Sequence, residues 1–272
     1  RKLTAMIHRT IEFHGKTINF QDEGSSDEVL VLLHGFMNNL EVWKNFVLDY
    51  MRSIRVVAID LIGHGESDVV EDVSSMELQA EAIKAVLDSL NVSKCVMVGH
   101  SMGGMITLAF AEKYPEYLKG FCLLHSQAMS DNPKGIENRK RACKLINDDK
   151  LKYIVDFIPN LFAKDNIAKC ASEIEDLKDI AISTKKEGIV AAQLGMIERR
   201  DRQDVLSSST VPVLFIAGSQ DIRIDILNIM AQATLPKFSE TMLLDCGHMS
   251  FIEEEKIIKQ RLLSFTKMCF SL

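Results

Sequence analysis

The chain lacks the features that mark membrane proteins, zinc or redox modules and nucleic-acid-binding proteins. No stretch approaches the roughly 18 consecutive apolar residues that suggest a membrane span. The six cysteines are dispersed without a C-x-x-C pair, which predicts neither a zinc site nor a dithiol redox motif. Acidic side chains outnumber basic ones by 38 to 32, and the net charge of −6 argues against a nucleic acid or an anionic membrane as a partner.

Residues 1–10 also lack the charged-then-apolar layout of a secretory signal. Several cysteines lie within apolar runs, where a thiol behaves as a small hydrophobic side chain. We therefore expect free, buried thiols and a cytoplasmic location. Hydrophobic residues make up 47 % of the chain and charged residues 26 %, as in ordinary globular proteins, and a monomer or homodimer is expected.

Short apolar runs alternate with helical patterns, which is typical of βα units around a parallel sheet. The runs are continuous, as expected of strands covered on both faces. They occupy 29–33, 54–59, 95–98, 121–124, 211–216 and 241–244. Near the N-terminus, His14-Gly15 predicts the turn of an antiparallel hairpin at one edge. The predicted fold class is α/β, with a mostly parallel twisted sheet flanked by helices.

Two helices have recognisable starts. Ser74 and Glu77 form a capping box before a segment with apolar residues at helical spacing. A last helix is predicted over 253–265, with Glu253, Glu254 and Glu255 in its first turn, where the helix dipole favours acidic side chains.

Residues 129–206 break this alternation of strands and helices. They contain no strand-like run, and charged residues mix with apolar residues at helical spacing. A structureless loop of that length within a compact domain is implausible. We therefore predict a helical cap over 129–206, inserted between strands of a core that comprises 1–128 and 207–272.

Residues 99–103, Gly-His-Ser-Met-Gly, match the pattern G-x-S-x-G. The motif follows a predicted strand and opens a predicted helix over 101–114, which is the strand–turn–helix context of a nucleophile elbow. The serine of such a turn is strained, so only small residues two positions away on either side let the strand and the helix approach. This context favours Ser101 as a nucleophile over a glycine-rich turn with a capping serine.

Asp221 and His248 each follow a predicted strand, so we expect both at the same carboxyl edge of the sheet as Ser101. His248 is predicted to be the general base, and Asp221 the acid that orients its imidazole. Asp245 is a weaker candidate because it still lies on the strand. The segment 125–127 follows another strand but offers no carboxylate.

The loop after the first parallel strand begins His34-Gly35-Phe36. Acyl transfer needs two backbone donors for the oxyanion, and the N–H groups of Phe36 and Met102 stand at the expected positions. His34 is expected to hold this loop by hydrogen bonds. Residues 60–67, with two glycines but no P-loop lysine, predict a structured turn and not a phosphate site.

Together, these motifs resemble the α/β-hydrolase superfamily, in which serine, aspartate and histidine follow in this chain order. The most similar branch contains small bacterial esterases, enol-lactonases and carbon–carbon bond hydrolases. Ser101 differs from the aspartate nucleophile of dehalogenases and epoxide hydrolases, and Met102 from the tryptophan of proline iminopeptidases. The resemblance is carried by His34-Gly35-Phe36, Asp60-x-x-Gly63-His64-Gly65-x-Ser67, Gly99-His100-Ser101-Met102-Gly103-Gly104, Gly218-Ser219-Gln220-Asp221 and Gly247-His248.

These residues predict a serine hydrolase that cleaves a small or medium ester or lactone through an acyl-enzyme, without a cofactor or metal. A carbon–carbon bond hydrolase, a thioesterase, a perhydrolase and a non-catalytic ligand receptor on the same fold are the alternatives. Arg139, Arg199 and Arg200 are candidates to pair with a substrate carboxylate, although a solvated cap face is the simpler interpretation. The candidate substrate-binding residues are His34, Met129, Phe157, Phe162, Leu194 and Met196.

Overall fold

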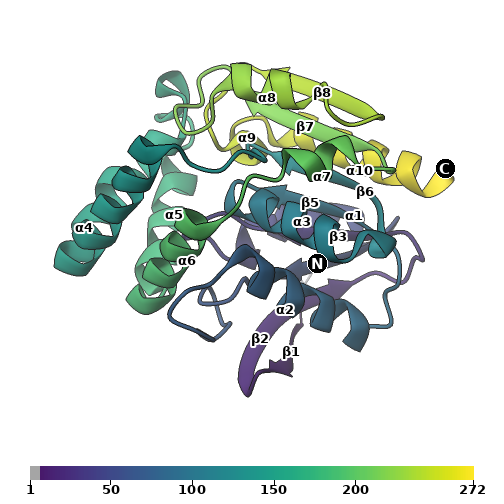
Figure 1. Cartoon of the computed structure of the whole chain (residues 1–272), viewed down its shortest axis with the longest axis horizontal. Helices are drawn as coiled ribbons and strands as arrows, with labels where there is room; N and C mark the ends of the chain where they lie inside the picture. The colour runs from purple at the N-terminus through teal and green to yellow at the C-terminus, as the bar shows by residue number, and fades with distance from the viewer. Residues whose placement is uncertain (1–6) are drawn as a thin grey trace.

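The computed structural model describes residues 7–272 as a central sheet with helices on both faces (Figure 1). The strands are β1 (His8–Phe13), β2 (Lys16–Glu23), β3 (Val29–Leu33), β4 (Arg55–Ile59), β5 (Cys95–His100), β6 (Leu118–Leu124), β7 (Val213–Gly218) and β8 (Ser239–Leu244). Their order is β1-β2-β4-β3-β5-β6-β7-β8. Strand β2 is antiparallel to both of its neighbours, whereas all pairings from β4 to β8 are parallel. The predicted parallel sheet with an antiparallel edge is confirmed.

Helices cover both faces of this sheet. They are α1 (Lys44–Tyr50), α2 (Met76–Ser89), α3 (Met102–Lys113), α4 (Pro133–Phe157), α5 (Ala171–Ser183), α6 (Lys186–Glu198), α7 (Gln203–Ser207), α8 (Ile226–Gln232), α9 (Ser250–Glu253) and α10 (Glu255–Ser271). Short 3₁₀ turns are η1 (Leu40–Trp43), η2 (Pro115–Tyr117), η3 (Pro159–Leu161) and η4 (Lys164–Asn166). Helices α2 and α3 pack on one face, in front of the sheet in Figure 1, and α1 and α10 pack on the other. No helix within residues 7–272 combines the length and apolar character needed to span a membrane.

Strand β3 shows why the apolar runs are continuous. Successive side chains of a strand point to opposite faces of the sheet. Val31 and Leu33 pack with α2 and α3, whereas Leu30 and Leu32 pack with α1 and α10. All four side chains are fully buried. A strand between two helical layers therefore needs an apolar residue at every position.

The cysteines are part of this packing. All six are free; Cys143 is half-buried and the other five are buried. Burial raises the pKa of the Cys95 thiol to about 12, so it is protonated and packs as an apolar group at neutral pH.

The segment between β6 and β7 consists of helices and turns, as predicted for an insertion. Helix α4 is kinked at Asp149, where φ is −154° and ψ is 88°, so it has two arms. Helices α4, α5 and α6 lie together at one end of the molecule, on the left of Figure 1. Val205 and Leu206 in α7 pack into the apolar cluster on the face of the sheet that α2 and α3 cover. This last helix of the insertion therefore adjoins the core. The division into a core and a cap over 129–206 stays a prediction.

Two predicted helix starts require correction. The N-cap of α2 is Ser75, whose side chain accepts a hydrogen bond from Leu78 N, and the buried hydroxyl of Ser74 has no partner within residues 7–272. The C-terminal helix begins at Glu255, because Glu253 ends the separate turn α9 and is only 2 % exposed. Two neighbouring serines are equally good N-caps, and neighbouring glutamates suit the first turn of a helix equally well. The sequence pattern therefore does not show at which of them the helix begins.

The loop after β4 is a structured turn, as predicted, and the structure shows that one carboxylate organises it. Asp60 accepts hydrogen bonds from Leu40 N at 2.8 Å, Glu66 N at 2.9 Å and Asn19 Nδ2 at 2.8 Å. Gly63, with a φ of 78°, packs directly against Gly188 of α6. The turn thus joins the sheet to the inserted helices.

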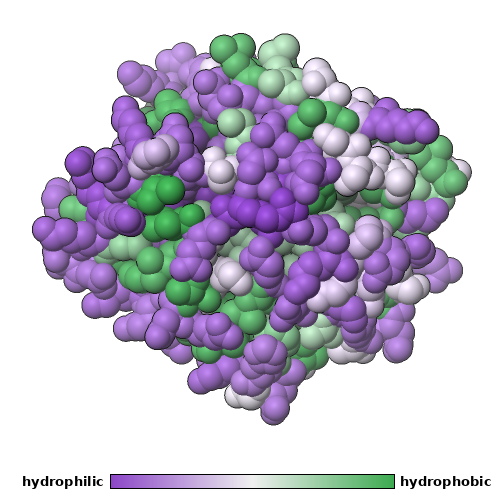
Figure 2. All heavy atoms as spheres, viewed as in Figure 1, coloured by the Kyte–Doolittle hydropathy of each residue, from purple (hydrophilic) through white to green (hydrophobic). Residues whose placement is uncertain are grey.

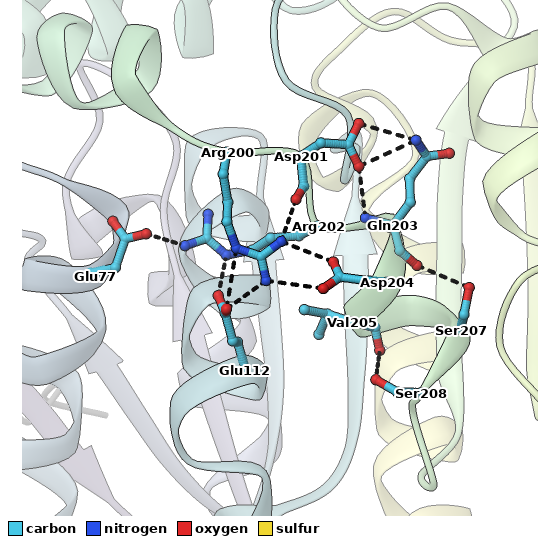
Figure 3. Close-up of polar contacts among 10 residues, drawn as sticks. All are labelled: Glu77, Glu112, Arg200, Asp201, Arg202, Gln203, Asp204, Val205, Ser207 and Ser208. Atoms are coloured by element: carbon cyan, nitrogen blue, oxygen red, sulfur yellow. Dashed lines mark hydrogen bonds and ion pairs between the residues drawn. The ribbon is translucent and has the colours of Figure 1, made fainter.

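Charged side chains hold the C-terminal end of the insertion against α2 and α3 (Figure 3). Arg202, whose side chain is 2 % exposed, donates from Nε to Glu112 Oε2 at 2.9 Å and from Nη2 to Glu77. Arg200 donates from Nη2 to the other oxygen of Glu112 at 2.5 Å. The most hydrophilic atoms of this face lie near its centre in Figure 2, where the connection between α6 and α7 runs in Figure 1.

The substitution Glu112→Gln is expected to lower the free energy of unfolding by about 1–2 kcal/mol, because Arg202 loses one of its two carboxylate partners. Urea unfolding followed by circular dichroism measures this change. Glu116→Gln is the matched control, since it removes the same charge from an exposed side chain that has no polar partner within residues 7–272. Equal free energies of unfolding of Glu112→Gln and the wild type would show that the ion pairs of Glu112 do not stabilise the fold.

Candidate functional site

Ser101 occupies the sharp turn between β5 and α3. Its φ of 52° and ψ of −113° are strained for a residue with a side chain. The turn is held in place, because Ser101 N donates to Leu124 O at 2.9 Å and Gly104 N donates to Ser101 O at 2.9 Å. This is the backbone of a nucleophile elbow.

The flanking glycines allow the strand and the helix to approach. A Cβ on Gly99 would lie 2.2 Å from the backbone oxygen of Gly103. A Cβ on Gly103 would lie 2.7 Å from the backbone oxygens of Leu33 and His34. Backbone atoms cannot move aside as a flexible side chain can, so both positions require glycine.

Asp221 and His248 meet at the carboxyl edge of the sheet, after β7 and β8. His248 Nδ1 lies 2.7 Å from Asp221 Oδ2, and the two side chains are 5 % and 2 % exposed. The other carboxylate oxygen accepts the backbone N–H of Arg223 at 2.7 Å. An ionised carboxylate only accepts hydrogen bonds, so it selects the tautomer of His248 with hydrogen on Nδ1. Nε2 is then free to accept a proton.

A second histidine, His125, shares the same carboxylate oxygen, and the sequence analysis did not identify it. His125 Nδ1 lies 3.1 Å from Asp221 Oδ2, and its Nε2 lies 2.7 Å from Ser250 Oγ. The imidazole is fully buried and follows directly after β6. Because Asp221 is the acceptor, His125 donates through Nδ1 and accepts the hydroxyl hydrogen of Ser250 at Nε2.

The pKa values in this cluster keep the acid ionised. Burial raises the pKa of Asp221, but its electrostatic interaction with His248 and the hydrogen bonds from His125 and His248 outweigh it, so the pKa lies well below the usual range. Burial lowers the pKa of His125 despite the neighbouring carboxylate. At neutral pH, Asp221 therefore carries its negative charge beside a neutral His125.

Glu253 fixes the backbone that carries His248. Its buried carboxylate accepts Gly247 N at 3.0 Å and Met249 N at 3.2 Å. It also accepts Ala163 N at 3.0 Å and Asn166 Nδ2 at 2.8 Å from the inserted segment. One buried acid thus ties the histidine loop to the insertion.

The two backbone amides predicted to bind an oxyanion are available. Within residues 7–272, neither Phe36 N nor Met102 N donates to an acceptor of the protein. His34 has the loop-holding role expected of it, because Nδ1 contacts Gly35 O at 2.8 Å and Nε2 accepts Leu61 N at 3.0 Å. Gly35 leaves space for His100, since a Cβ there would lie 2.5 Å from His100 Nδ1.

Ser101, His248 and Phe36 line one cavity of about 290 Å³. Of the six candidate substrate-binding residues, Phe157 and Met196 also line it. The other four do not: His34 holds the loop, Phe162 packs in the buried core, and Met129 and Leu194 are half-buried elsewhere in the inserted segment. Apolar residues at helical spacing do not reveal which of them face a cavity and which pack.

Several lining residues were missed by the sequence analysis, and two of them are aromatic or cationic. Tyr153 comes from α4, and Arg223 comes from the loop that carries Asp221. Tyr153 stacks on Phe157 with ring centroids 5.4 Å apart. The spacing of Arg223 from Asp221 was the available signal, because a residue two positions from the predicted acid lies in the same loop at the edge of the sheet.

The three arginines considered as partners for a substrate carboxylate have different surroundings. Arg139 lines the cavity, whereas Arg199 is buried and does not line it; both bind the carboxylate of Asp131. Arg200 lies outside the cavity and pairs with Glu112 and Asp204.

His125, Asp221 and His248 are also the described residues that could hold a metal ion, because their ligand atoms lie within 4.8 Å of one another. The hydrogen bonds described above already join both Nδ1 atoms to Oδ2. The cluster therefore serves as a network of hydrogen bonds around one carboxylate.

Comparison with known proteins shows to which protein family the chain belongs. A family model described as the alpha/beta hydrolase fold matches residues 28–165. By sequence, the chain is similar to a 2-hydroxy-6-oxononadienedioate/2-hydroxy-6-oxononatrienedioate hydrolase of Escherichia coli, with 40 % identity over 113 residues, which is 39 % of each chain.

Two solved structures are similar over nearly their whole length. A thermophilic esterase from Thermogutta terrifontis, determined with malate bound, has a TM-score of 0.90 and 28 % identity, and the match covers 98 % of this chain and 99 % of that one. An enol-lactonase from Burkholderia xenovorans has a TM-score of 0.89, with 95 % and 100 % coverage. Its identity of 19 % makes this a likeness of fold alone.

The stability of the folded chain is expected to fall between pH 7.5 and pH 5. Burial lowers the pKa of His34 to about 4 and that of His64 to about 3. Above about pH 6.5, this contribution to stability is fully present. As the pH falls toward 4, the unfolded chain binds protons that the folded chain cannot, so the contribution is lost. Each histidine should account for about 2 kcal/mol at pH 5, measured by urea unfolding at the two pH values.

The variant His34→Gln is the matched control, because glutamine keeps a donor and an acceptor but does not titrate. Its stability should depend less on pH than that of the wild type. A wild-type stability that is the same at pH 7.5 and pH 5 would show that these buried histidines do not resist protonation.

Proposed function

Because the chain belongs to the alpha/beta hydrolase family, we propose that it is a serine hydrolase that cleaves a small or medium ester or lactone through an acyl-enzyme intermediate. The observation that carries this proposal is the convergence of three side chains. Ser101 on a strained turn and His248, held by Asp221 at 2.7 Å, line the same cavity.

In the proposed reaction, Ser101 Oγ attacks the carbonyl carbon while His248 Nε2 takes the hydroxyl proton. Asp221 keeps the imidazole oriented and stabilises its protonated form. The N–H groups of Phe36 and Met102 stabilise the oxyanion. His248 then protonates the leaving alcohol, and a water molecule activated by the same imidazole hydrolyses the acyl-enzyme.

Within residues 7–272, no hydrogen bond joins the Ser101 hydroxyl to His248. Catalytic hydrogen bonds are often long in the unliganded enzyme and tighten when substrate binds. The proposal therefore requires the two side chains, which line the same cavity, to come within hydrogen-bond distance when substrate binds.

Carbon–carbon bond hydrolysis is the second candidate. The E. coli relative, which is named for such a reaction, supports it over 39 % of the chain. The esterase from Thermogutta terrifontis matches nearly the whole chain, which favours the ester. A panel of p-nitrophenyl esters, thioesters and vinylogous diketones separates these reactions from thioester hydrolysis.

The substitution Ser101→Ala is expected to lower kcat on p-nitrophenyl esters by a factor on the order of 10⁶, because the three residues act as a unit. Labelling by a fluorophosphonate probe should disappear at the same time. Ser264→Ala, an exposed serine of α10, is the control and should label normally. Turnover close to wild type in Ser101→Ala would exclude this mechanism, and a wild type that neither labels nor turns over would point to a receptor.

We also propose that His125 is a positioning residue for Asp221. Its hydrogen bond lowers the pKa of the carboxyl. Without that bond, the carboxylate of Asp221 stabilises the protonated form of His248 more strongly. The substitution His125→Phe should therefore raise the pH at the midpoint of the acid limb of the kcat/KM profile by about 0.5–1 pH unit. His125→Asn retains a donor and should move it less. An unchanged acid limb in His125→Phe would leave His125 a purely structural role.

A further inference from the structure

The cavity beside Ser101 carries an excess of positive charge, although the protein as a whole has a net charge of −6. The permanently charged side chains that line it are Arg139, Arg223 and Asp131. Arginine remains protonated in proteins, so the two guanidinium groups are charged at any pH at which the protein is folded. The local sign is therefore opposite to that of the molecule.

Asp131 does not neutralise this excess, because its two oxygens are already shared. Arg139 Nε lies 2.5 Å from Oδ2, and Arg199 makes two further contacts, Nη1–Oδ2 at 2.9 Å and Nη2–Oδ1 at 2.8 Å. One carboxylate thus serves two guanidinium groups. Arg199 does not line the cavity, and its Nη1 also donates to Met196 O at 2.7 Å.

Arg223 has no such partner. Within residues 7–272, no carboxylate oxygen lies within 4.0 Å of its guanidinium nitrogens. The guanidinium is instead held over the ring of Phe157, 4.3 Å from the ring centroid, which is a cation–π contact. Its backbone N–H bonds Asp221 Oδ1 at 2.7 Å, so the residue has a fixed position beside the proposed triad. The donors of the guanidinium fork remain available to a ligand.

The charges beyond Phe157 and Arg223 determine the side on which an anion is favoured. These two residues and Tyr153 also border an outer cleft of about 500 Å³ between the two arms of α4. That cleft is lined by Asp148, Asp149 and Asp156 against Arg141, Lys152 and Arg223, so its positive and negative charges balance. The outer cleft therefore offers an anionic group no net attraction, whereas the excess of positive charge in the inner cavity, where Ser101 lies, attracts it.

We propose that the natural substrate is an ester or lactone with a free carboxylate, and that Arg223, with Arg139 beside it, binds this carboxylate in the cavity. This inference rests on the proposed ester hydrolysis at Ser101. The guanidinium fork matches a carboxylate with two parallel hydrogen bonds, which a lysine in its place would not provide. Arg223 is thus a residue that determines specificity.

Two pairs of substrates test this inference and locate the carboxylate. Monomethyl adipate and its amide analogue, in which a carboxamide replaces the free carboxylate, place the group on the acyl side. The pair 4-acetoxybenzoate and 4-acetoxybenzamide places it on the alcohol side. In at least one pair, kcat/KM of the wild type should favour the anion by about 10–100-fold, since hydrogen bonds to charged groups have that effect. No preference in either pair would overturn the inference.

Three substitutions assign the preference to Arg223. Arg223→Gln should abolish the ratio between the anionic and the neutral ester, mainly through KM, and Arg223→Lys should retain part of it. Arg52→Gln is the matched control, because it removes one positive charge from an exposed residue after α1, outside the cavity. The wild-type ratio should fall as salt is added. An equal loss of the ratio in Arg52→Gln and Arg223→Gln would show a general charge effect and reject the site.

Binding to an inactive variant separates failure of this inference from failure of the proposed reaction. Adipate should bind Ser101→Ala in a calorimetric titration, and binding should weaken by about tenfold or more in Ser101→Ala with Arg223→Gln. Adipate binding without any ester hydrolysis by the wild type would retain the anion site and reject the reaction. Ester hydrolysis without adipate binding and without a charge preference would retain the reaction and reject the site.

Discussion

Strand β5 and helix α3 approach each other so closely that neither Gly99 nor Gly103 has room for a Cβ, and the placement of Ser101 depends on this contact. The chain must reverse within one residue, so Ser101 takes a φ of 52°. Such a backbone is unfavourable for serine by itself, by roughly 1–3 kcal/mol. It persists because the strand is buried in the middle of a parallel sheet and the helix is buried against it. The packing of the core thus holds the strained turn.

Buried carboxylates organise the rest of the site. Asp221 orients His248 from one side and receives His125 on the other, while Glu253 gathers the backbone N–H groups of the histidine loop and of the inserted segment. A buried acid is costly unless its oxygens are fully hydrogen-bonded, and both of these acids have several donors. Because the donors to each acid come from more than one segment of the chain, the same bonds that satisfy the charge also fix how those segments meet.

The sequence predicted the parts of this arrangement that follow from local rules. Continuous apolar runs identified the strands of the parallel sheet, and G-x-S-x-G after one of them identified the elbow. Where two candidates stand side by side, the local rule does not separate them, as with Ser74 and Ser75 at the start of α2. His125 was missed because a histidine donating to a carboxylate 96 positions away has no local signature. Which apolar side chains face a cavity also depends on the tertiary contacts, which is why Phe157 at the end of α4 lines the cavity and Phe162, just after η3, packs in the core.

The positive charge of the cavity also arises from tertiary contacts between segments that are far apart in the sequence. Arg139 comes from α4 and Arg223 from the loop after β7, and the fold brings them to one cavity. The net charge of −6 describes the protein at a distance, but charges in water are screened beyond about 8–10 Å. A bound substrate therefore responds to the few side chains that surround it. The acidic composition that argues against a nucleic-acid partner is for this reason compatible with a cationic site for a small anion.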